Sequence, residues 1–91
     1  MTAQDREKSR ASEQRVLDEL SGSIGARVLD LLGKPGDLHR VQVRRLWEGH
    51  FRVNVLTGAD AASAKVSHSY FLEADGTGTI LASTPPISRR Y

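Results

Sequence analysis

The chain has 91 residues and no cysteine, and its formal net charge is +2. A chain of this length forms one domain that buries only about 60–65% of the surface of its unfolded form, and it has no disulfide or thiolate metal site to reinforce so small a core. No apolar run approaches the ~20 residues of a membrane-spanning helix, and residues 1–15 lack the apolar segment of a signal peptide. We therefore expect a cytoplasmic protein without membrane association. An excess of arginine over lysine and frequent alanine are typical of bacteria with GC-rich genomes.

Residues 11–32 predict an amphipathic helix. Its apolar stripe, spaced by three or four residues, consists of Leu17, Leu20, Ile24, Val28 and Leu31, widened by Val16 and Leu32. Gly33 and then Pro35 predict the end of the helix, because glycine favours the left-handed C-terminal position and proline cannot continue a helix. Gly22 and Gly25 each cost about 1 kcal/mol relative to alanine. The helix therefore either breaks near them or is one long helix with a weak centre, which we favour.

We divide the chain into a polar N-terminal segment of residues 1–10, a single α+β domain of residues 11–84, and a C-terminal tail of residues 85–91. The N-terminal segment is either a frayed start of the helix or a disordered tail. A helix that began near residue 3 would be longer than the strands, so part of it would overhang the sheet. The C-terminal tail begins with two prolines, which lack the amide hydrogen that a central strand needs.

After the helix the apolar period changes from 3.6 to 2, which predicts two strands joined by a turn. A three-residue loop would pair Trp47 with Phe51. Arg45 would then lie on the apolar face, unless a bulge at Arg44 and Arg45 turned Leu46 inward. In both cases the side chains expected to face the helix are Val41, Val43, Phe51, Val53 and Val55.

Residues 57–64 are small and predict a loop, and the segment after them predicts a second hairpin with Asp75 and Gly76 as its two-residue turn. In that register Phe71 lies opposite Ile80. One face carries Val66, His68, Tyr70, Leu72 and Leu81, and the other carries Ser67, Ser69, Phe71, Ile80 and Ala82. We expect the first set to face the helix, because its side chains are larger; the alternative exchanges the two faces.

Together these elements predict an α+β fold in two layers, with one long N-terminal amphipathic helix packed on a four-stranded antiparallel β-meander. Folds of this kind host many unrelated functions. The function has to be argued from particular side chains.

The sequence shows no arrangement typical of an enzyme or a metal site. The histidines, His39, His50 and His68, are far apart in the chain, and no phosphate-binding or nucleophile motif is present. Ser69 and His68 are neighbours on a strand and point to opposite faces, so they cannot form a catalytic pair. We expect a non-catalytic protein without cofactor or metal, in which His68 is a part-buried residue of the core layer.

The first hairpin holds the local excess of positive charge, with four arginines against one glutamate in residues 38–56. Its face away from the helix is expected to carry Arg40, Gln42, Arg44, Arg52 and Asn54, with Ser67 and Ser69 beside them on the next strand. Arginine suits phosphate oxygens, and the amides of Gln and Asn suit base edges, so these side chains are candidate contacts for nucleic acid or another anion. The commoner role of such a face is to be the solvated side of an antiparallel sheet.

Three apolar side chains are candidates for a protein interface: Trp47 at the tip of the first hairpin, and Phe71 with Ile80 on the outer face of the second. Exposed large apolar groups mark interfaces, and tryptophan is prominent in interface energetics. The alternatives are that the C-terminal tail covers Phe71 and Ile80, and that Trp47 is a core residue. A further candidate surface, suited to a second helix, is the set of small helical residues Ser21, Gly22 and Gly25.

The leading hypothesis is a small bacterial domain that acts through protein contacts, including self-association, because a core this small often depends on a partner. The expected partner is then a second copy of the chain or another protein. The alternative hypothesis is nucleic-acid binding through the arginine-rich outer face of the first hairpin.

Overall fold

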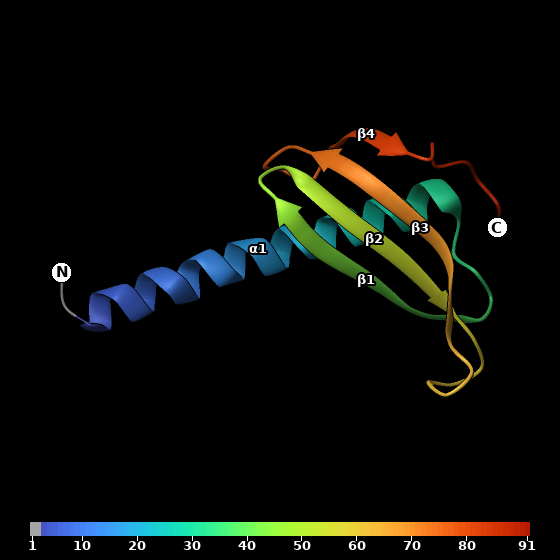
Figure 1. Cartoon of the computed structure of the whole chain (residues 1–91), viewed down its shortest axis with the longest axis horizontal. Coiled ribbons are helices and arrows are strands. Elements are labelled where there is room, and N and C mark those ends of the chain that lie inside the picture. The colour runs from blue at the N-terminus through green and yellow to red at the C-terminus, as the bar shows by residue number, and fades with distance from the viewer. Residues whose placement is uncertain (1–2) are drawn as a thin grey trace.

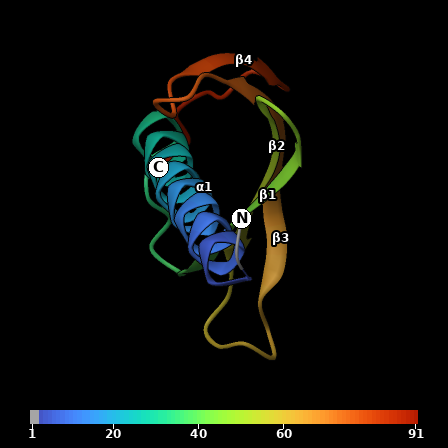
Figure 2. The same ribbon diagram turned by 90° about the vertical axis from the view of Figure 1, so that its left-hand side faces the viewer.

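The computed structural model of the chain describes the backbone of residues 3–91 and the side chains of residues 12–91, and it contains one helix followed by four strands (Figure 1). The elements are α1 (Ala3–Leu32), β1 (Leu38–Trp47), β2 (His50–Thr57), β3 (Lys65–Ala74) and β4 (Ile80–Thr84). The strands form one antiparallel sheet in the order β1-β2-β3-β4. Figure 2 shows the sheet curving around α1, which covers one of its faces. The predicted two-layer α+β fold is confirmed.

Helix α1 runs through Gly22 and Gly25 without a break, as predicted for one long helix. It ends at Leu32, where Gly33 adopts the left-handed conformation with φ 88° and its amide donates to the carbonyl oxygen of Leu29 at 2.8 Å. A helix of this length measures about 45 Å at 1.5 Å per residue, and its first half projects beyond the sheet (Figure 1). In the described part of the chain, no helix is long and apolar enough to cross a membrane.

The core-facing side of α1 is narrower than the predicted stripe. Ile24, Val28 and Leu32 are fully buried, and Leu20 packs beside them. The stripe was wrong at Val16 and Leu31, which are 61% and 48% exposed. Two steps of four residues from Ile24 reach Leu32, and this turns Leu31 away from the sheet. The core is completed from the sheet by Phe51, Val53, Val55, Tyr70, Leu72 and Ala74. Val41 and Val43 are partly buried against it, so the residues predicted to face α1 from the first hairpin are confirmed.

The predicted register of the first hairpin was wrong. A two-residue turn at Glu48 and Gly49 pairs Trp47 with His50, and Gly49 supplies the positive φ, 73°, that the turn requires. The register shift lies between Arg45 and Trp47, one residue beyond the expected bulge. As a result Arg45 lies opposite the buried Phe51 on the helix side, while Trp47 points to the other face of the sheet.

The second hairpin also differs from its predicted register. Asp75 and Gly76 do not form a two-residue turn, because the Asp75 carboxylate accepts hydrogen bonds from the Thr77 amide, the Thr77 hydroxyl and the Thr79 amide and holds a longer loop. Ala74 is therefore paired with Ile80, not Phe71 with Ile80.

This shift changes the side of the sheet on which several side chains lie. Ile80 packs against the core, and Leu81, which we expected inside, is 59% exposed. Val66 was also expected inside and is exposed, because a register shift between β2 and β3 leaves Ser67 as the extra residue. Tyr70 and Leu72 are buried as predicted.

The tail of residues 85–91 folds back to the end of α1. The amides of Arg90 and Tyr91 donate to the carbonyl oxygen of Leu32 at 2.8 and 3.2 Å, and Ile87 packs against the core. The tail thus lies on the helix side of the sheet and leaves Phe71 uncovered.

Candidate interaction surface

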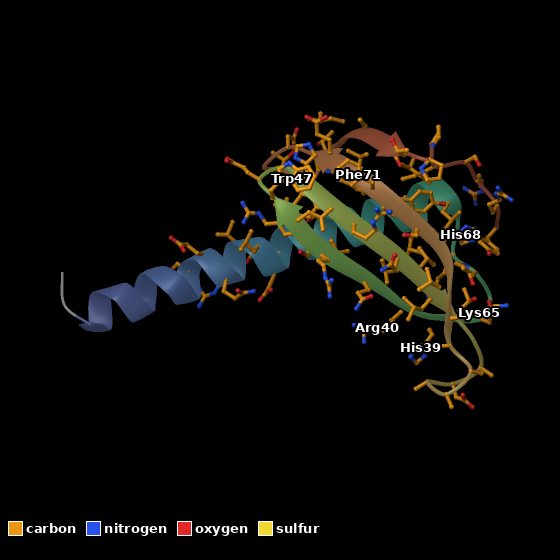
Figure 3. All side chains as sticks on the ribbon, in the orientation of Figure 1. His39, Arg40, Trp47, Lys65, His68 and Phe71 are labelled. Atoms are coloured by element: carbon orange, nitrogen blue, oxygen red, sulfur yellow. The ribbon has the colours of Figure 1, made fainter. Side chains whose placement is uncertain are left out.

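The face of the sheet opposite α1 brings together most of the predicted contact residues. We call this surface the outer face and define it by Arg40, Gln42, Arg44, Trp47, His50, Arg52, Asn54, Ser69 and Phe71. It contains all five candidate anion contacts and two of the three candidate interface residues, Trp47 and Phe71. Figure 3 shows these two rings at one end of the sheet and Arg40 toward the other end of β1. Ile80 lies on the opposite side, against the core.

An aromatic cluster of Trp47, His50 and Phe71 forms one end of the outer face. The centroids of the Trp47 and His50 rings are 4.6 Å apart, with an angle of 28° between the rings. Phe71 lies 5.7 Å from Trp47 and 5.8 Å from His50, distances typical of favourable aromatic pairs. His50 Nδ1 is 2.9 Å from the carbonyl oxygen of Glu48, to which it donates. The cluster is therefore held in place, although Trp47 is 55% exposed.

Arginines border the aromatic cluster. Arg44 and Arg52 lie directly opposite each other on β1 and β2, and Arg52 lies opposite Phe71 on its other side. The Arg52 guanidinium carbon is 5.9 Å from the centroid of the Phe71 ring, within cation–π range. Arg40 lies opposite Leu56. No acid is the cross-strand partner of any of the three arginines, so the charge of this part of the face is positive.

A row of amide and hydroxyl groups follows the arginines. Gln42, Asn54 and Ser69 are cross-strand neighbours. The Ser69 hydroxyl donates to Asn54 Oδ1 at 2.7 Å, and Asn54 Nδ2 donates to Gln42 Oε1 at 3.4 Å. These bonds fix the amide of Asn54, while Gln42 remains exposed at the free side of β1. The prediction that Ser67 lies in this row was wrong, since its hydroxyl forms a hydrogen bond with the hydroxyl of the buried Thr57.

Sequence reasoning missed His50 and the contact between Trp47 and Phe71. The available signal was the Glu48–Gly49 pair, because a glycine with positive φ closes a two-residue turn and sends Trp47 and His50 to the same face. The acid nearest to this corner by register is Glu73, which lies opposite His50.

A groove lies on the other side of the sheet, where α1 leaves it. Its outer part, about 440 Å³, is lined by Ser12, Glu13, Val16, Leu17 and Arg45. Its inner part, about 390 Å³, lies between Leu17, Leu20, Phe51 and the turns of the two hairpins. Val16 is 61% exposed at the mouth. The groove thus combines apolar side chains with charged ones, and Leu17 and Arg45 line both parts.

The histidines take separate positions. His50 belongs to the aromatic cluster, His39 is exposed on β1, and half-buried His68 lies 2.9 Å from the hydroxyl of Tyr91 through its Nε2. The Ser69 hydroxyl donates its hydrogen bond to Asn54 on the outer face, so it does not contact His68. Among the described residues, no three His, Asp or Glu side chains are grouped closely enough to hold a metal ion.

Comparison of the chain with protein families, with curated proteins and with solved structures gave no match. Any function must therefore be argued from the chemistry of these two surfaces.

Proposed function

We propose that this protein is a non-catalytic module that acts through protein contacts, and that the outer face is its main contact surface. The observation that carries the proposal is Trp47, more than half exposed and yet packed against His50 and Phe71. Tryptophan and arginine are the side chains most enriched at the energetic centres of protein interfaces. A ring that is already held in place loses little conformational freedom when a partner covers it.

The arginines indicate the charge of that partner. Arg40, Arg44 and Arg52 lie on one face and have no acid opposite them. A partner with carboxylates would neutralise them, and the planar guanidinium binds carboxylates through two parallel hydrogen bonds. We therefore expect an acidic protein surface to bind the outer face. We also expect the protein to act in the bacterial cytoplasm. This expectation comes from the composition of the chain, and cell fractionation tests it.

Self-association forms a second part of the proposal. Two outer faces in contact would bring six arginines together, so this face suits a different protein better than a second copy. The groove beside α1 suits a second copy, because it combines exposed Val16 with Leu17 at a place where the helix extends beyond its own sheet. A small core gains from such added burial.

Capture from a lysate of the source organism tests the main proposal. The wild-type protein, Trp47→Ala and Leu81→Ala are immobilised in parallel, and the captured proteins are compared. Leu81 is the matched control, since it is similarly exposed and lies on β4, at the opposite edge of the sheet from the strand that carries Trp47. Loss of a captured protein in Trp47→Ala alone supports the proposal. Equal capture by all three variants contradicts it.

Sedimentation velocity over a range of concentrations tests self-association. We expect a dimer that Val16→Asp converts to a monomer and that Trp47→Ala leaves intact. A wild-type protein that stays monomeric at high concentration contradicts this part and leaves the main proposal standing.

Nucleic-acid binding is the second candidate function, and one observation favours it: Arg44 and Arg52 adjoin an aromatic cluster. Proteins that bind single strands combine arginines along the backbone with aromatic rings on which bases stack. The test is fluorescence anisotropy of a labelled oligonucleotide at several salt concentrations. Loss of one phosphate contact in Arg44→Gln should lower the slope of log affinity against log salt by about 0.7 for a single strand. Absence of binding at low salt excludes this candidate.

A further inference from the structure

The two edges of the sheet differ in how well they are protected. β4 is only five residues long and is followed by two prolines, which lack the amide hydrogens that would extend its pairing. β1 has ten residues and no proline, and among the strands of the described chain it pairs with β2 alone. From Arg40 to Arg45 its register is regular. Figure 1 shows β1 as the outermost strand, so it offers an extended row of backbone N–H and C=O groups to another chain.

The two sides of β1 carry different chemistry along this regular stretch. Arg40, Gln42 and Arg44 lie on the outer face and are exposed, whereas Val41 and Val43 point to the helix side and are only partly buried. A strand that paired with β1 would place its own side chains alternately beside these two sets. Each would lie about 4.5–5.5 Å from its cross-strand neighbour.

We propose that β1 accepts an extended peptide in which acidic and apolar residues alternate, and that this peptide joins the sheet as a fifth strand. The inference rests on the proposed function and names the class of partner. Backbone hydrogen bonds hold the peptide, and the alternate side chains select its sequence. Its carboxylates lie beside Arg40 and Arg44, and its apolar side chains extend the surface of Val41 and Val43.

A second copy of this chain is a poorer match to the edge than an acidic strand. Two β1 strands paired antiparallel about Gln42, the centre of the regular stretch, would place Arg40 of each copy beside Arg44 of the other. Like charges directly opposite each other destabilise a sheet. Charged side chains on an edge strand commonly prevent it from pairing with the edge strand of another copy. The same arginines that oppose self-pairing attract an acidic strand.

The test uses three short labelled peptides with the full-length protein. In the first peptide glutamate alternates with valine or threonine, in the second lysine replaces glutamate, and the third is the first with alternate backbone amides methylated. Methylation removes the hydrogen-bond donors of one edge and keeps the charge. Anisotropy gives the affinities, and hydrogen exchange followed by NMR gives the protection of the β1 amides.

We expect the glutamate peptide to bind best and to slow exchange along residues 40–45. Two cross-strand pairs contribute a preference of about 2- to 30-fold over the lysine peptide. The double variant R40E/R44E should reverse this order and bind the lysine peptide better. Both arginines are exposed, and circular dichroism verifies that the variant is folded.

Other outcomes overturn the inference. Equal binding of the methylated peptide, without protection of β1, would show attraction to the outer face without strand addition. Absence of binding by all three peptides would exclude an acidic strand as the ligand of this edge. The capture experiment with Trp47→Ala tests the proposed function independently of the peptide experiment. Trp47 lies outside residues 40–45, so the two experiments can fail separately.

Discussion

Arg44 and Arg52 lie directly opposite each other on β1 and β2, and the other cross-strand neighbour of Arg52 is Phe71. A pair of like charges in this position lowers the stability of the sheet. The outer face therefore carries a cost in the free protein that an anionic partner would remove. This relationship connects the stability of the fold with its proposed binding role.

Replacing one member of the pair should stabilise the free protein. For Arg44→Gln we expect the free energy of unfolding to rise by about 0.2–1 kcal/mol at low salt. The gain should shrink at high salt, because salt screens exposed charges. Urea denaturation at two ionic strengths measures both effects, with Arg89→Gln in the exposed tail as the control. A variant that is less stable than the wild type at low salt would contradict the prediction.

The two phenylalanines of the sheet should respond very differently to truncation. Phe51 is 1% exposed within the core, whereas Phe71 lies on the outer face. Phe51→Ala should lower the free energy of unfolding by about 3–5 kcal/mol, and Phe71→Ala by about 1 kcal/mol from its aromatic contacts. Urea denaturation gives the comparison, and Phe51→Leu with Phe71→Leu repeats it if the alanine variant of Phe51 does not fold. Equal losses would contradict the assignment of the two faces.

The sequence predicted the fold correctly in segments where apolar residues recur with a single period. The 3.6 period of α1, its stop at Gly33 and the alternation along β2 all appear in the structure. The outer positions Arg40, Gln42 and Arg44 were also placed correctly, because they lie where β1 and β2 pair regularly.

Apolar periodicity alone could not predict the hairpin registers, because each depends on one extra residue. The shifts near Leu46, Ser67 and Leu81 each reverse the side of the sheet for the residues beyond them. Such shifts follow from turn geometry and tertiary packing, which periodicity does not report. Ile80 was consequently placed with Phe71, and the contact of Phe71 with Trp47 was missed.

Two glycines near or in α1 should respond in opposite ways to alanine. At Gly22 an added Cβ meets nothing within 4 Å, so Gly22→Ala should raise the free energy of unfolding by about 0.4–1 kcal/mol through helix propensity and the unfolded state. At Gly33 a Cβ would overlap the backbone of Tyr91, and the left-handed φ of 88° costs a non-glycine residue about 1–2 kcal/mol. Thermal and urea denaturation of Gly22→Ala and Gly33→Ala measure this contrast. A stabilising Gly33→Ala would contradict the docking of the tail at the helix end.

The loop between β3 and β4 should make stability depend on pH through Asp75. Hydrogen bonds from the Thr77 hydroxyl, the Thr77 amide and the Thr79 amide hold the pKa of the Asp75 carboxyl below its ordinary value of 3.8. Since the unfolded chain then binds a proton more readily than the folded one, the carboxylate contributes stability above pH 3.8 and loses it as the pH falls through the lower folded pKa.

Asp75→Asn separates this effect from the other carboxylates. An asparagine oxygen still accepts hydrogen bonds but carries no charge, so the variant should be less stable than the wild type at neutral pH and should approach it in acid. Urea denaturation of both proteins from neutral pH to below the ordinary aspartate pKa measures the difference, and NMR titration of the Asp75 carboxyl checks its cause. A difference that does not change with pH would mean that the loop depends on the shape of the side chain and not on its charge. In that case the longer loop, and with it the position of Ile80 against the core, would depend on Gly78, which adopts a φ of 85° and lies so close to α1 that an added Cβ would be only 3.0 Å from that of Ser23.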